Sequence, residues 1–171
     1  LKEQLEEVNI PLDSKVKIQT DWQLQRYAQF IKLMDQYEPK LVVIDSLIGC
    51  SGGRAFDENK SDFAQPLYWL TRNNGVLFPK TTILIIHHAN KNGGFRGTSA
   101  IRDAVDETWK LSKPTQEQAN KVGRSSRFIT IEKSRSGRMG TQMIMKMKED
   151  LTFSIEDFTP EVSNDPSSPT T

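Results

Sequence analysis

Cysteine and long hydrophobic runs are what this sequence most clearly lacks. Cys50 is the single cysteine, which excludes an internal disulfide framework and a zinc site made of cysteines alone, and favours a reducing, cytoplasmic compartment. The longest apolar runs, at 41–44 and 83–86, are far shorter than the ~20 residues that cross a bilayer. The sequence therefore predicts no membrane-spanning helix.

An excess of charge of either sign is also missing. The chain carries 23 Lys and Arg residues against 22 Asp and Glu residues, a formal net charge of +1, which argues against a highly basic coat for nucleic acid but leaves room for a local basic patch. The length of 171 residues and the 36% hydrophobic and 26% charged content are typical of one globular domain. We expect this domain over residues 1–157, with a disordered Pro- and Ser-rich tail over 158–171.

The beginning of the chain has neither a methionine nor a signal-peptide pattern. We expect that the chain was processed or is a piece of something longer. Residues 2–8 are expected to form the end of a charged helix that Pro11 stops, and residues 16–20 a short strand.

The hydrophobic pattern of the remaining chain predicts an α/β fold. Apolar side chains recur at helical spacing over residues 22–37, and Pro39 ends that helix. Unbroken apolar runs at 41–44 and 82–86 are typical of strands buried on both faces of a parallel sheet. The other expected elements are a loop at 49–60, a helix at 61–74 that Pro66 kinks or delays, a mobile glycine-rich loop at 90–97, a short helix at 98–105, and strands at 107–111, 128–133, 141–148 and 151–155.

This order of elements predicts a mostly parallel sheet sandwiched by helices, with antiparallel strands at the C-terminal end around a hairpin turn at 134–140. Ligands of such sheets bind beyond the carboxyl ends of the strands. The residues that follow the expected strands are therefore the candidates for a functional site.

Asp45 and Ser46 directly follow the apolar run 41–44. An aspartate at this position can simply cap the strand and turn the chain. It can also help to hold Mg²⁺, directly or through water, with Ser46 beside it. The tetrapeptide pattern alone leaves both interpretations open.

His87 and His88 follow the second apolar run. They can be a polar end of the strand, a metal-binding pair, or a sensor of the terminal phosphate of a nucleotide. Adjacent residues on an extended strand point to opposite sides, which disfavours the metal-binding pair. Asp45 and Asp57 are the carboxylates that could complete such a metal site.

Basic residues occur around the glycine-rich loop at Lys91, Arg96 and Arg102. The segment can be a surface loop followed by a helix whose N-cap is Thr98 or Ser99. It can also face an anion, and we expect Lys91 and Arg96 in particular to contact a single strand of nucleic acid in a salt-sensitive way.

Lys133 and Arg135 lie at the start of the hairpin turn. A charge run of this kind can be an exposed, solvated turn. The two side chains are two positions apart on a strand-like segment, however, so they are expected to share one face and could together clamp a phosphoryl group.

Read together, these segments resemble the RecA-like ATPase cores of the RepA-type and DnaB-type hexameric replicative helicases. The RepA-like branch is more similar, because it shares the apolar-Asp-Ser-Leu strand, the double His and the stretch Arg-Gly-Thr-Ser-Ala-Ile-Arg-Asp-Ala at 96–104. The resemblance covers about residues 1–153. The segments that carry it are 41–47, 83–91, 96–106 and 132–140.

The resemblance implies an ATP-driven motor that works on single-stranded DNA as a hexameric ring. It implies that Asp45 supports Mg²⁺ as a Walker B aspartate and that His87 or His88 senses the γ-phosphate. It also implies that the loop 93–98 touches the nucleic acid. Lys133 and Arg135 would reach the nucleotide of a neighbouring subunit.

One required motif of that family is missing. No Gly-x-x-x-x-Gly-Lys-(Ser/Thr) stretch occurs in the chain, and the family's catalytic glutamate would lie upstream of Leu1. We therefore expect the chain to be the C-terminal part of the motor core and neither to bind ATP well nor to hydrolyse it. An in-frame Gly-Lys-Thr stretch upstream of Leu1 would favour this hypothesis.

The sequence is also compatible with two other hypotheses. The chain can be a non-catalytic RecA-like binding or assembly module that lost the phosphate loop by evolution. It can also be a metal-dependent phosphoesterase that uses Asp45, His87 and His88 around Zn²⁺ or Mn²⁺.

Overall fold

The computed structural model describes residues 15–53, 57–150 and 152–158. The chain divides into two compact units, unit 1 (Leu1–Asp106) and unit 2 (Glu107–Thr171). The single domain expected over 1–157 stays a prediction. Unit 1 holds α2 (Tyr27–Tyr37), β1 (Leu41–Asp45), the 3-10 turns η1 (Gly49–Ser51) and η2 (Ser61–Ala64), α3 (Gln65–Asn73), β2 (Thr82–Ile86) and α4 (Ser99–Asp103). Unit 2 holds β3 (Glu107–Ser112), α5 (Gln116–Val122), β4 (Arg127–Ser134), β5 (Gln142–Met147) and β6 (Phe153–Asp157).

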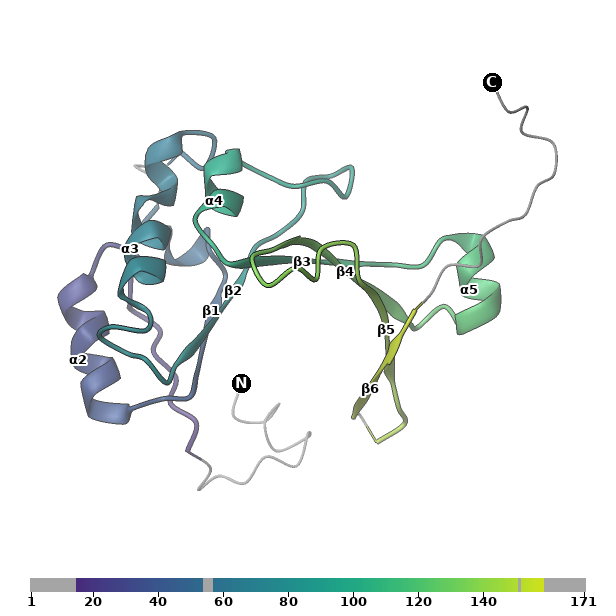
Figure 1. Cartoon of the computed structure of the whole chain (residues 1–171), viewed down its shortest axis with the longest axis horizontal. Coiled ribbons are helices and arrows are strands. Elements are labelled where there is room, and N and C mark those ends of the chain that lie inside the picture. The colour runs from purple at the N-terminus through teal and green to yellow at the C-terminus, as the bar shows by residue number, and fades with distance from the viewer. Residues whose placement is uncertain (1–14, 54–56, 151, 159–171) are drawn as a thin grey trace. The chain divides into compact units, whose positions relative to one another are not determined.

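A parallel pair of strands, β1 and β2, forms the sheet of unit 1. Their residues pair in register from Leu41 with Thr82 to Asp45 with Ile86. Helices α2 and α3 lie on the same side of this pair (Figure 1). The parallel pairing of these two strands confirms that part of the prediction for the runs 41–44 and 82–86, whereas the expected burial on both faces is wrong, because one face of the pair is exposed in unit 1.

The core of unit 1 lies between β1–β2 and the two helices. Ile44 of β1 is 3% exposed, and the partly buried Val42, Ile83 and Ile85 pack against the same cluster. Aromatic rings contribute to this core, with Trp22, Phe30, Trp69 and Phe78 in tilted or edge contacts. The alternate residues on the opposite face of the two strands are exposed, namely Leu41, Val43, Leu84 and Ile86.

Local signals explain where the helices begin and end. Helix α2 ends as Glu38 takes a left-handed conformation (φ +42°) and donates its backbone N–H to the carbonyl of Met34 at 2.8 Å, just before Pro39. Helix α3 begins with Pro66 in its first turn, where a missing N–H has no consequence. The delayed start that Pro66 predicted is confirmed.

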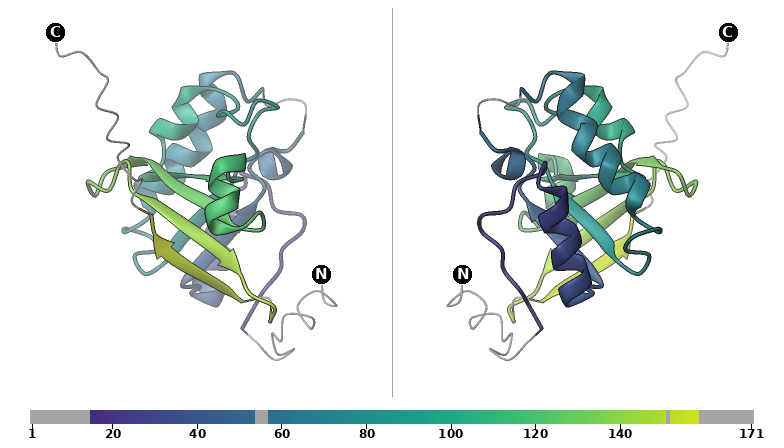
Figure 2. Two further views of the ribbon diagram at one scale, coloured as in Figure 1. Left: turned by 90° about the vertical axis from the view of Figure 1, so that its right-hand side faces the viewer. Right: turned by 90° about the vertical axis from the view of Figure 1, so that its left-hand side faces the viewer.

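Unit 2 is a four-stranded antiparallel sheet in the order β3–β4–β5–β6. The left view of Figure 2 shows the yellow-green strands β5 and β6 at its end. The antiparallel hairpin predicted around 134–140 is confirmed as β4 and β5. Helix α5 was not predicted, although Thr115 and Gln118 form a capping box at its start.

Several predictions about the fold are wrong. The described residues contain a two-stranded parallel sheet and a separate antiparallel one, rather than a mostly parallel sheet sandwiched by helices. Strand β3, expected at 107–111 after the parallel strands, pairs antiparallel with β4. An apolar or alternating run indicates a strand but carries no information about its partner, which contacts distant in the sequence decide.

Two N-terminal elements also differ from the prediction. Residues 16–20 form no strand. The helix expected from residue 22 begins at Tyr27, because Leu24 donates its N–H to the carbonyl of Cys50 at 2.8 Å and is buried there outside the helix. The helix expected at 2–8 and the tail beyond residue 158 lie outside the described residues.

Candidate functional site at the ends of β1 and β2

Asp45 is the last residue of β1 and is exposed. A cis peptide bond joins it to Ser46. Ser46 starts the following turn, since its carbonyl accepts the N–H of Cys50 at 2.9 Å and its Oγ accepts the N–H of Gly49 at 3.3 Å. The N–H of Leu47 donates a hydrogen bond to the carbonyl of Ile86, the last residue of β2, at 2.8 Å. The strand-capping interpretation of this segment therefore describes its local structure well.

Cys50 follows this turn and lies close enough to Asp45 for an electrostatic interaction. Burial, and then the negative charge of Asp45, raise the pKa of the Cys50 thiol. Because the thiolate is the reactive form, the thiol is disfavoured as a nucleophile. For a cation such as Mg²⁺, which prefers oxygen ligands, the side chains of Asp45 and Ser46 provide oxygen atoms at this end of β1.

His87 and His88 have different surroundings at the end of β2. His87 is half-buried, and its Nε2 lies 2.7 Å from the carbonyl oxygen of Arg96. A carbonyl only accepts hydrogen bonds, so Nε2 carries the proton. The buried Nδ1 has no hydrogen-bond partner among the described residues. His88 is exposed, as expected for adjacent residues of an extended chain.

The metal-site interpretation gains no support from this arrangement. Within residues 15–53, 57–150 and 152–158, no three His, Cys, Asp or Glu side chains cluster closely enough to hold a metal ion. Asp57, the other candidate carboxylate, instead accepts hydrogen bonds at 3.0 Å from the backbone and side-chain nitrogens of Asn59.

Asn90 organises the glycine-rich loop. Its Oδ1 accepts the N–H groups of Asn92 at 3.0 Å and Gly94 at 2.9 Å, and its Nδ2 donates to the carbonyl of Phe95 at 3.1 Å. The side chain thus closes a hydrogen-bonded turn that leads into Arg96. The mobility expected for 90–97 stays a prediction, and the structure adds a defined conformation for the loop.

Thr98 ends this loop as the N-cap of α4, with its Oγ1 accepting the N–H of Ala100 at 3.3 Å. This confirms one of the two N-caps expected from the sequence. Arg102 on α4 places its guanidinium 5.5 Å from the centre of the Phe95 ring, and the same ring lies 5.4 Å from that of His87. Arg102 and His87 therefore both contact the Phe95 ring, whereas Lys91 is exposed.

Glu58 is the residue of this site that sequence reasoning missed. Its carboxylate Oε1 binds the Nε of Arg96, and its backbone carbonyl accepts the N–H of Thr98 at 2.8 Å. The stretch Asp57-Glu58-Asn59-Lys60 looks like any polar loop. The contact joins residues 38 positions apart, so no local signal could have revealed it.

Lys133 and Arg135 belong to unit 2. Lys133 lies on β4 opposite Thr108, and Arg135 is exposed just beyond the end of that strand. The neighbouring turn is held by Glu107, whose carboxylate accepts hydrogen bonds from Ser134, Ser136, Arg138 and Trp109 at 2.8–3.0 Å. These donors lower the pKa of Glu107 to about 2, with Ser136 and Arg138 the largest causes.

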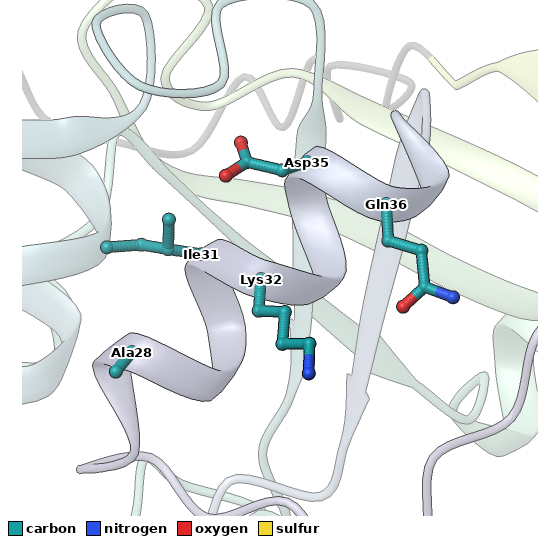
Figure 3. A pocket seen from close by; sticks show the side chains of 5 residues that line it. All are labelled: Ala28, Ile31, Lys32, Asp35 and Gln36. Atoms are coloured by element: carbon teal, nitrogen blue, oxygen red, sulfur yellow. The ribbon is translucent and has the colours of Figure 1, made fainter.

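A surface depression elsewhere in unit 1 offers no comparable chemistry. Its lining residues are Ala28, Ile31, Lys32, Asp35 and Gln36. All of them belong to α2, and Figure 3 shows Lys32 and Asp35 pointing to different sides of that helix. Because no second element contributes a polar group, we place the candidate site at the ends of β1 and β2.

No helix of the described part of the chain is both long enough and apolar enough to span a membrane. Among known proteins, neither a family model nor a curated sequence matches the chain.

Proposed function

We propose that the chain is the nucleic-acid-contacting part of an ATP-driven motor core of the helicase type, and that Arg96 contacts the phosphates of single-stranded DNA. One observation carries this proposal. The carbonyl of Arg96 lies 2.7 Å from His87 Nε2, at the end of the strand that pairs with the Asp45 strand. A cation for DNA and an acid for Mg²⁺ therefore follow neighbouring strands.

The residues fit the proposed cation only in part. Asp45 and Ser46 provide oxygen atoms, which Mg²⁺ prefers, but the phosphate-loop motif is not among the 171 residues. When ATP and Mg²⁺ are bound, the ion neutralises the phosphate charge. Asp45 would support that ion, and His87 would pass a movement at the end of β2 to the loop that ends in Arg96.

Two further roles belong to the same proposal. Lys91 and Arg102 add positive charge on either side of Arg96, and Lys133 and Arg135 would meet the nucleotide of a neighbouring subunit in a hexameric ring. The phosphate-loop motif is not among the 171 residues, so this chain alone should not turn over ATP. ATP hydrolysis by the purified chain that Asp45→Ala abolishes would overturn this part of the proposal.

DNA binding is measured with a fluorescein-labelled poly-dT oligonucleotide of about 20 nucleotides, by fluorescence anisotropy at several salt concentrations. Arg96→Ala should weaken binding about tenfold and lower the salt slope by about 1, as expected for one lost phosphate contact. Lys80→Ala removes an exposed cation just before β2, at its other end, and is the matched control. Equal losses from the two variants would contradict a specific site.

The missing phosphate-loop motif favours a second candidate, a binding module that never uses ATP. The two candidates differ in their response to nucleotide. A motor part should bind poly-dT differently when Mg²⁺ and ATP are added at high concentration, and Asp45→Asn should remove the difference. If the chain is a binding module, Mg²⁺ and ATP should not change poly-dT binding by the wild type or by Asp45→Asn.

A further inference from the structure

Arg96 is held at its side chain and at its backbone. Its Nε donates to Glu58 Oε1, and its carbonyl oxygen lies 2.7 Å from His87 Nε2. Its side chain is nevertheless 47% exposed. An arginine carries five N–H donors, and the contact with Glu58 uses the one on Nε. Among the described residues the Arg96 side chain has no other hydrogen bond, so within that part of the chain the donors of both Nη atoms remain for a ligand.

Glu58 is unusual for a carboxylate on a loop because it is only 8% exposed. Its Oε2 is buried and has no hydrogen-bond partner among the described residues. A buried carboxylate needs a cation beside it, and Arg96 supplies the positive charge. The ion pair is thus built into unit 1 and differs from a surface pair of two mobile side chains.

The backbones of the two partners are also held together. The carbonyl of Glu58 accepts the N–H of Thr98 at 2.8 Å, and a Cβ placed on Gly97 would lie only 2.7 Å from that carbonyl oxygen. Gly97 has a φ of +88°, which other residues rarely adopt. A glycine at this position therefore lets the 96–98 segment approach Glu58 closely.

We infer that Glu58 is a positioning residue for a phosphate-binding arginine: it holds Nε of Arg96, so that the two Nη groups present a fixed fork to one phosphodiester of a single strand. A planar guanidinium binds a phosphate through two parallel hydrogen bonds. An anchored guanidinium loses less side-chain entropy on binding than a free one. This inference rests on the proposed function, because it assigns the orientation of the same DNA-contacting residue.

The opposite role for Glu58 would be inhibitory: its carboxylate would pair with Arg96 until a DNA phosphate took the place of the carboxylate. The burial of Glu58 argues against this inhibitory role. If Arg96 left for a phosphate, the carboxylate would stay buried without a partner, which is strongly unfavourable. DNA should therefore bind Arg96 while Glu58 still holds it.

Two conservative substitutions separate the two roles. Glu58→Asp keeps the negative charge but shortens the side chain, so that it no longer reaches Nε. Glu58→Gln removes the charge but keeps an oxygen that accepts from Nε. If Glu58 is an anchor, Glu58→Asp should weaken poly-dT binding several-fold, towards the level of Arg96→Ala, and Glu58→Gln should restore it to within about twofold of wild type.

The matched control is Asp62→Ala, which removes an exposed acid from η2, close to Glu58 in the sequence. It should leave binding within about twofold of wild type, since interactions of an exposed charge are screened by salt. In the Arg96→Ala background, Glu58→Asp should have no further effect on affinity or on the salt slope. This non-additivity is not expected of a residue that only stabilises the fold.

The possible outcomes distinguish the inference from the function on which it rests. Tighter binding by Glu58→Gln, or unchanged binding by Glu58→Asp while Arg96→Ala weakens it, would overturn the anchoring role alone. No effect of Arg96→Ala would overturn the DNA contact itself. Circular dichroism and thermal melting test folding. If Glu58→Asp does not fold, stronger binding by Glu58→Gln still overturns the anchor.

Discussion

His87 Nε2 donates a hydrogen bond across 2.7 Å to the carbonyl oxygen of Arg96, which ties the end of β2 to the end of the glycine-rich loop. Asn90 closes the loop from within, so that the chain between His87 and Arg96 forms one hydrogen-bonded unit. A shift at the end of β2 would thus move Arg96 directly.

Replacing His87 should loosen this loop. His87→Ala removes a hydrogen bond to the backbone, worth about 1 kcal/mol, and should increase hydrogen exchange across residues 90–97. It should also weaken poly-dT binding. His88→Ala, at the exposed neighbour, is the control and should change neither quantity. Equal exchange in the two variants would show that the hydrogen bond does not hold the loop.

Gly97→Ala should destabilise unit 1 more than Gly93→Ala. Both glycines have a positive φ, +88° and +73°, so both substitutions carry a conformational penalty of about 1 kcal/mol. Only at Gly97 would the new Cβ meet the backbone, 2.7 Å from the carbonyl of Glu58, whereas nothing lies within 4 Å of it at Gly93. The difference between the two free energies of unfolding in urea measures the close approach, and similar values would contradict it.

Adjacent residues of β1 should respond differently to truncation. Ile44 is 3% exposed and Val43 is 50% exposed, because successive side chains of a strand point to opposite faces. Ile44→Ala should lower the free energy of unfolding by about 2–5 kcal/mol, and Val43→Ala by less than about 1 kcal/mol. A large loss from Val43→Ala would mean that the exposed face of β1 and β2 is covered in solution.

Glu107 should make the hairpin turn of unit 2 sensitive to strong acid. Its pKa is lowered from 4.5 to about 2, so the carboxylate contributes stability that is complete above the unfolded-state pKa and is lost as the pH falls from about 4.5 through about 2. The stability difference between wild type and Glu107→Gln should be constant above pH ~5 and should shrink below it.

The carboxyl carbon of Glu107 gives a direct measurement. Its NMR chemical shift should titrate with a midpoint near 2. For the stability comparison, Glu149→Gln at an exposed acid is the control for the loss of one surface charge. A midpoint near 4.5 would show that the hydrogen bonds from Ser136 and Arg138 do not hold the turn in solution.

Much of the local structure follows from residues close together in the chain. Pro39 and Pro66 mark a helix end and a helix start, Thr98 caps α4, and the apolar runs at 41–44 and 82–86 are parallel strands. These signals act within a few residues, through backbone sterics and side-chain hydrogen bonds. Helix α5 shows that such a signal can also be overlooked, since its capping box stands in the sequence.

The partners of these elements depend on distant contacts. Leu24 has the spacing of a helical residue, yet a hydrogen bond to Cys50 places it outside α2. Strand β3 follows two parallel strands in the sequence but pairs antiparallel with β4. Helical and strand periodicity describe one face of one element, whereas the choice of partner depends on which faces bury most apolar surface together.

The sequence by itself determined that Asp45 and His87 lie at or just beyond strand ends, because apolar runs and polar boundaries mark those ends locally, and that Arg96 belongs to the glycine-rich loop. Only the tertiary structure decided that His87 holds the backbone of Arg96 and that Glu58 holds its side chain. This ion pair joins residues 38 positions apart, and it exists only when folding buries Glu58 beside the half-exposed Arg96. No pattern within either segment encodes it.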